Sequence, residues 1–171
     1  MKFKPIKLLY IIPVVVFASL IFIFSSESGD KSEKTSGIVV DFVISVINKD
    51  YDNMDETLKI EYRDKVSFVI RKLAHYSIFL LLSISLIIML INLTNFSYIK
   101  SSLLTFSIAS LYALSDEVHQ FFIDGRAMEL RDLLIDVYGV VTGIIIINIM
   151  LLIISKNKTK KGNKNYGKDS A

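Results

Sequence analysis

Four long runs of apolar side chains constrain this chain more than any other feature of its sequence. They are Leu8–Phe24, Leu73–Leu93, Ser101–Ser115 and Val137–Ile154. An α-helix needs roughly 20 residues to cross about 30 Å of hydrocarbon, and each run approaches that length once its flanks are included. The apolar residues are continuous, whereas the amphipathic helices of soluble domains space them at helical intervals. We therefore predict an all-α, polytopic membrane protein with four transmembrane helices, at about residues 8–24, 70–92, 101–121 and 133–154.

The composition agrees with a membrane protein. Hydrophobic residues make up 52% of the 171 residues, and the mean hydropathy is +0.50, above the usual range of soluble domains. The length allows one domain, which we place at residues 1–155, and the Lys/Asn-rich segment 156–171 is predicted to be a disordered basic tail. An alternative treats the first run as a cleaved signal peptide and leaves three spans, but no A-x-A-like cleavage site follows it. Because cysteine is absent, disulfides and thiolate chemistry are excluded.

The distribution of Lys and Arg predicts how the chain is oriented. The N-terminus and the tail are basic, and loop 92–100 carries one lysine and no acid, whereas segments 25–65 and 116–132 are acidic overall. Positively charged short loops stay on the cytoplasmic side, so both termini and loop 92–100 should be cytoplasmic and the two acidic segments should lie outside. The net charge of +3 comes from these ends and does not indicate binding to nucleic acid.

The first outer segment contains an apolar stretch of its own, Ile38–Ile47. It is too short to span a membrane. We predict an interfacial helix there, lying over the outer ends of the other spans. Residues 55–65 are predicted to extend the second span outward, with a solvated linker as the alternative.

Ionisable and amide side chains gather where the spans end on the outer side. Because alternate spans run in opposite directions, residues scattered over 66 positions of sequence should meet at one face of the membrane. Such groups are costly next to hydrocarbon, which makes them functional candidates. The predicted cluster consists of Arg71, His75, Asp116, Glu117, His119, Gln120, Arg126, Asp132 and Asp136.

Helical spacing orients several members of this cluster. Asp116, His119 and Gln120 share one stripe with Tyr112, while Glu117 points about 100° away from Asp116. In the last span Asp132 and Asp136 continue the face of Gly139 and Gly143. This small-xxx-small face permits close packing of membrane helices. The two acids are therefore predicted to face protein and not lipid.

At these positions the chain resembles the VanZ-like family of bacterial integral membrane proteins, over about residues 21–154. The matching segments are Phe24–Ser26, Arg71–His75, Ser115–Gln120, Gly125–Arg126 and Asp132–Asp136 with Gly139 and Gly143. Asp124 departs from the family, which often has proline before the Gly-Arg pair. The resemblance implies a cell-envelope protein of the bacterial cytoplasmic membrane, and the founding member of the family is associated with resistance to the glycopeptide teicoplanin.

Three interpretations of the outer cluster remain open. In the first it is a structural ion-pair network in which Arg71 and Arg126 neutralise Asp116, Asp132 or Asp136. In the second the arginines bind an anionic headgroup, from a membrane lipid, a lipid-linked cell-wall precursor or a teichoic-acid lipid, although the acids oppose a bare phosphate. In the third the cluster is catalytic, and its candidate residues are His75, Asp116, Glu117 and His119.

The residue types suit a divalent cation, but no HExxH spacing and no cysteine ligand occur, so the sequence assigns no metal site and no cofactor. A transporter is disfavoured, because transporters place binding residues near the bilayer midplane. The expected function is that of a VanZ-like envelope protein whose outer polar site binds a lipid or cell-wall component and affects tolerance to teicoplanin-type glycopeptides. The alternative is a membrane-embedded hydrolase or transferase acting on a lipid-linked phosphate.

Overall fold

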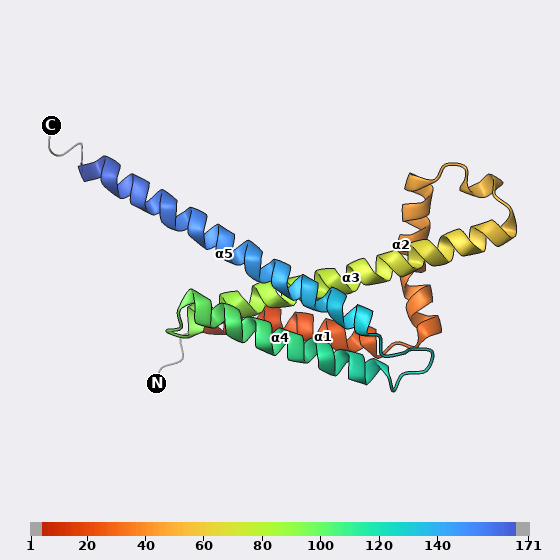
Figure 1. The fold of residues 1–171 in the computed structure, drawn as a ribbon, viewed down its shortest axis with the longest axis horizontal. Helices are drawn as coiled ribbons and strands as arrows, with labels where there is room; N and C mark the ends of the chain where they lie inside the picture. The colour runs from red at the N-terminus through yellow and green to blue at the C-terminus, as the bar shows by residue number, and fades with distance from the viewer. Residues whose placement is uncertain (1–4, 167–171) are drawn as a thin grey trace.

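The computed structural model describes residues 5–166, and every regular element within them is helical. Helices α1, α3, α4 and α5 lie alongside one another, and α2 crosses α3 near one end of this bundle (Figure 1). The prediction of an all-α fold is confirmed. The elements are the short 3-10 helices η1 (Pro5–Tyr10) and η2 (Tyr51–Asn53), and the α-helices α1 (Ile12–Ser25), α2 (Gly29–Ile47), α3 (Glu56–Leu93), α4 (Tyr98–Gln120) and α5 (Leu130–Tyr166).

Two of these helices, α3 and α5, are long and apolar enough to cross a membrane, and α1 is a shorter apolar helix of 14 residues. Only 28% and 22% of the most apolar windows of α3 and α5 are buried in the protein. Large apolar surfaces left exposed in this way suit contact with lipid. They indicate a membrane protein, while the four-span arrangement stays a prediction.

The helix bounds differ from the predicted spans at the first and last helices, and they agree with the predicted extension of the second span. The first span is divided, since η1 precedes α1 and Pro13 lies in the first turn of α1, where a missing amide hydrogen costs no helical bond. Helix α3 begins at Glu56, so the predicted outward extension is helical. Helix α5 continues to Tyr166, so residues 156–166, which were predicted to belong to a disordered tail, are helical. Residues 167–171 lie outside the described residues.

Helices α3 and α5 cross at close range because two glycines lie at their contact. A Cβ atom on Gly143 would be 2.7 Å from the carbonyl oxygen of Leu80 and would overlap the hydroxyl of Ser83, and one on Gly139 would overlap the carbonyl of Tyr76. The absence of side chains therefore lets the two backbones approach. The core beside this crossing is formed by Ile21, Phe79, Leu82, Ala109, Ala113 and Val140.

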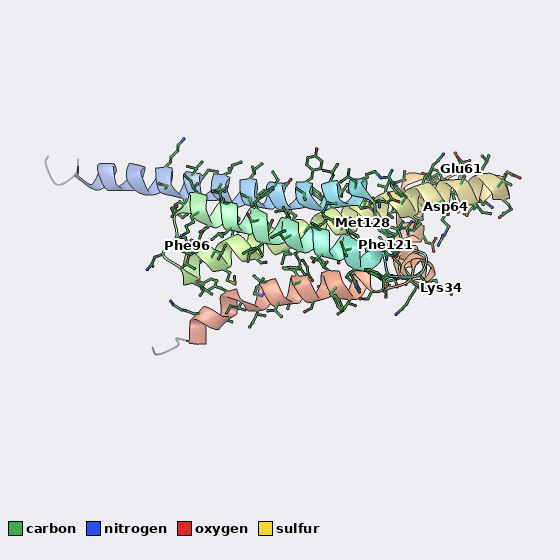
Figure 2. The ribbon with its side chains drawn as sticks, turned by 60° about the horizontal axis from the view of Figure 1, so that its bottom comes forward. Lys34, Glu61, Asp64, Phe96, Phe121 and Met128 are labelled. Atoms are coloured by element: carbon green, nitrogen blue, oxygen red, sulfur yellow. The ribbon has the colours of Figure 1, made fainter. Side chains whose placement is uncertain are left out.

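The up-and-down path of the chain brings three connections to the end of the bundle where α2 lies, which we call the α2 end (Figure 1). Phe121 and Met128 of the α4–α5 loop lie there, whereas Phe96 lies at the opposite end (Figure 2). The loop docks on the start of α2, where the amide of Gly29 donates to the carbonyl of Asp124 at 3.2 Å. Gly125 makes the turn with a φ of 73°, a conformation that other residues adopt at a cost.

Candidate functional site

The polar stripe of α4 faces α1 at the α2 end. Asp116 Oδ2 accepts hydrogen bonds from Ser25 Oγ at 2.7 Å and from Gln120 Nε2 at 2.9 Å. His119 Nε2 lies 3.1 Å from Ser26 Oγ. One turn earlier along the stripe, the Tyr112 hydroxyl donates to the carbonyl of Ala18 at 2.8 Å. The stripe predicted from helical spacing is thus the contact surface between α4 and α1.

Glu117 has a different role from the rest of the cluster. Its side chain is buried, and Oε2 accepts a hydrogen bond from the backbone amide of Glu129 at 3.1 Å. This bond ties the end of the α4–α5 loop to α4, on a different face of the helix from Asp116. Glu117 therefore positions the loop that carries Arg126.

The acids of α5 pair with side chains of α3 that differ from those expected. Lys72 Nζ forms an ion pair with Asp132, and His75 Nδ1 lies 3.6 Å from Asp136 Oδ1. The ion-pair interpretation expected Arg71 and Arg126 in these positions. Because consecutive helical residues point about 100° apart, only one of residues 71 and 72 can face α5, and it is Lys72.

The two arginines are consequently left without carboxylate partners. Arg126 donates to Gln120 Oε1 at 3.3 Å and to the carbonyl of Phe24 at 3.4 Å, and its Nε has no partner among the described residues. Burial lowers the pKa of Arg126, and the nearby charge of Arg71 lowers it further. Among the described residues neither guanidinium forms an ion pair. Two neighbouring positive charges are therefore without a carboxylate at ion-pair distance, although Asp116, Glu27 and Glu117 lie near enough to Arg126 to raise its pKa.

Two cavities meet at these arginines. The first, which we call the polar cavity, has a volume of about 430 Å³, and the second, the apolar cavity, has a volume of about 340 Å³. Arg71, His75 and Arg126 line both. The polar cavity is also lined by Phe68, Lys72, Gln120, Glu129, Asp132 and Asp136. The apolar cavity is also lined by Ile21, Phe24, Val39, Ile70 and Ile78, so that α1, α2 and α3 all contribute to it.

All nine predicted cluster residues lie at the α2 end. They make separate contacts and do not form one network. His75, Asp116 and Asp136 come from three helices, and each offers a ligand atom within 4.8 Å of the other two. His119 and Glu117 point to α1 and to the loop instead.

Sequence reasoning missed Ser25, which holds Asp116, and the pairing of Lys72. Both residues lie in segments that carry the family resemblance, which was the one signal that could have identified them.

A protein-family model described as VanZ/LLP1 matches residues 8–152, which is most of the chain. Neither a curated protein nor a solved structure matches.

Proposed function

We propose that this chain, which belongs to the VanZ/LLP1 family, is a cell-envelope protein that binds the phosphate headgroup of an amphiphile at the α2 end. The ligand class is a lipid-linked phosphate, such as a cell-wall precursor or a teichoic-acid lipid. The observation that carries the proposal is that Arg71 and Arg126 line both cavities while neither forms an ion pair among the described residues.

None of the acids near the arginines forms an ion pair with them, and of these acids only Asp136 lacks both a hydrogen bond and a lysine or arginine partner among the described residues. Glu27, which also lines the apolar cavity, lies 3.6 Å from Lys31. Asp132 pairs with Lys72, and Glu129 pairs with the exposed Arg131 at 2.8 Å. Glu117 accepts the loop amide. Guanidinium groups bind phosphate through paired, charge-assisted hydrogen bonds. An anionic headgroup between Arg71 and Arg126 would supply a counter-charge at ion-pair distance.

The apolar cavity supports an amphiphile as the ligand in preference to free phosphate. It shares three lining residues with the polar cavity. The remaining lining consists of six apolar side chains, from α1, α2 and α3, together with Glu27, Ser32, Thr35 and Ser36. Ligand sites are typically apolar pockets with a few convergent polar groups. A phosphate at the junction of the two cavities would place its attached hydrocarbon chain along α1, α2 and α3.

We place the α2 end on the outer face of the cytoplasmic membrane, with both termini cytoplasmic, because α1 begins and α5 ends away from it, beside the lysine-rich ends of the chain (Figure 1). Helix α2 exposes Ile38 and Phe42, with 81% and 69% of their surface accessible. An amphipathic helix with such a face lies in the interface between headgroups and acyl chains. In this position α2 would form the membrane-side wall of the apolar cavity.

Removing either arginine should weaken binding of a polyprenyl phosphate to the purified protein in nanodiscs. Hydrogen bonds to charged groups contribute about 1.5–3 kcal/mol, so Arg71→Gln and Arg126→Gln should each weaken binding by roughly tenfold or more. Lys65→Gln is the matched control, because this lysine lies on α3, is exposed and pairs with Glu61. The measurement is equilibrium binding of a radiolabelled polyprenyl phosphate, with the uncharged polyprenol as competitor. Equal affinity of wild type and both arginine variants would contradict the proposal.

Hydrolysis or transfer of the bound phosphate is the second candidate function. It is favoured by the position of His75, whose ring lies within 4.8 Å of both Asp116 and Asp136, as a general base and its orienting acid would. Assaying the same mixtures for released inorganic phosphate separates an enzyme from a binding protein. In cells, the proposal extends to tolerance of teicoplanin-type glycopeptides, which the wild type would raise and the double arginine variant would not.

A further inference from the structure

Three helices bring a nitrogen donor and two carboxylates together beside the polar cavity. His75 comes from α3, Asp116 from α4 and Asp136 from α5, and their ligand atoms lie within 4.8 Å of one another. Asp116 and Asp136 are almost fully buried, at 4% and 0% exposure. The set is assembled only by the fold, since its members lie far apart in the sequence with no recognised metal-binding spacing.

An independent observation comes from the hydrogen bonds of Asp136. Both of its carboxylate oxygens are buried, and neither has a hydrogen-bond partner among the described residues. The nearest cationic group is the ring of His75, whose Nδ1 at 3.6 Å is beyond hydrogen-bond range. Lys72 is engaged with Asp132. A buried carboxylate without a hydrogen bond is costly. The His75 ring faces one Asp136 oxygen only at the long distance of 3.6 Å, so a cation bonded directly to Asp136 would compensate its charge more closely than the neighbouring side chains do.

The hydrogen bonds of Asp116 fix the orientation of its carboxylate, as expected of a side chain that binds a metal ion. Ser25 and Gln120 both donate to its Oδ2, and Gln120 is in turn held by Arg126. Hydrogen bonds of this kind fix the direction of a carboxylate that binds a metal.

We propose that His75, Asp116 and Asp136 bind a divalent cation, with Mn²⁺ or Zn²⁺ as the ions that suit one imidazole and two carboxylates. Bonds to such ions are about 2.0–2.2 Å long, so neighbouring ligand atoms around an ion lie about 3.0–3.6 Å apart. His75 Nδ1 and Asp136 Oδ1 are 3.6 Å apart, and side-chain rotations would close the rest of the 4.8 Å set to this size. His75 and Asp136 line the polar cavity, so the remaining coordination positions face it.

The cation would also reduce the electrostatic repulsion between a bound phosphate and the carboxylates at the α2 end. Coordinated by three protein ligands, it would present positive charge to the cavity beside Arg71 and Arg126. This contact with a headgroup rests on the proposed function, whereas the cation site itself does not.

The test uses the full-length protein in nanodiscs, stripped with a chelator and titrated with Mn²⁺ alone. The wild type should bind one ion per chain, and its electron spin-echo signal should show a coupling to ¹⁴N from the His75 ring. Loss of an outer partner alone costs about 10–100-fold in metal affinity, so Asp136→Asn should weaken binding at least that much. His75→Ala should remove the nitrogen coupling. The matched control is Asp64→Asn, an exposed carboxylate on the protruding part of α3 (Figure 2).

If Asp136→Asn or His75→Ala fails to fold, Asp116→Asn tests the same three metal ligands. The wild-type protein should also gain thermal stability from Mn²⁺, and Asp136→Asn should not. The proposal is overturned if the wild type binds no ion, or if His75→Ala retains the nitrogen coupling and full affinity. Because no polyprenyl phosphate is present in this titration, its failure would leave the arginine-dependent binding of polyprenyl phosphate unaffected, and the reverse also holds.

Discussion

Gly143→Leu should strongly destabilise the protein, because the atoms that a larger side chain would meet include backbone that cannot rotate away. A Cβ atom at this position already approaches the Leu80 carbonyl to 2.7 Å. Overpacking typically lowers the free energy of unfolding by about 1–3 kcal/mol. We expect a loss at the upper end of this range, because α3 and α5 would have to move apart to admit the leucine side chain. We expect a clear loss of folded protein in detergent extracts and a lower melting temperature, measured by size-exclusion chromatography after a heating series.

Gly37→Leu provides the matched control for this prediction. Gly37 also lies within a helix, but the one atom that its Cβ would approach within 4 Å is the end of the flexible Arg63 side chain, at 3.4 Å. This variant should therefore fold as well as the wild type. If Gly143→Leu kept the wild-type melting temperature, α3 and α5 would not cross at this residue.

Lys72→Met should produce the second large effect, because it would leave Asp132 without its cation. The two side chains are only 21% and 19% exposed, and the second oxygen of Asp132 is buried without a hydrogen-bond partner among the described residues. Breaking a buried ion pair costs about 3–5 kcal/mol, and the residual exposure places this pair near the lower figure. The double variant Lys72→Met with Asp132→Leu removes both charges and should recover most of the lost stability.

The exposed pair of Lys65 and Glu61 gives the comparison for this effect. Its side chains are 71% and 62% exposed, and pairs of this kind contribute about 0–1 kcal/mol. Lys65→Met should thus leave the melting temperature nearly unchanged. If the Lys72→Met variant matched Lys65→Met, or the double variant were as unstable as Lys72→Met alone, the buried pair would not stabilise the fold.

The convergence of the polar residues was predictable because antiparallel helices place the end of one beside the start of the next. His75, Asp116 and Asp136 meet at the α2 end for this reason. The contact at Gly139 and Gly143 was predictable as well, because a small-residue face has few other uses in a membrane helix.

The choice of ion pairs could not be predicted from the sequence. Arg71 and Lys72 are adjacent cations on one helix that point about 100° apart, and the orientation of α3 about its axis decides which of them faces Asp132. The packing of α1 could not be predicted either. Because that helix is apolar on every side, its periodicity did not indicate that Ser25 would face Asp116. The two cavities depend on these same helix orientations, and so does the absence, among the described residues, of ion pairs between the acids and Arg71 or Arg126.

The central claim is that the α2 end, with its charged side chains, faces the outside of the cell, and the absence of native cysteine makes it directly testable. Asp124→Cys introduces a thiol in the α4–α5 loop at the α2 end, and Asn95→Cys introduces one in the loop between α3 and α4 at the opposite end. Both positions are exposed. In intact cells a membrane-impermeant maleimide should label the variant at position 124, whereas the variant at position 95 should react only after permeabilisation. Labelling of position 95 but not of position 124 in intact cells would contradict the account.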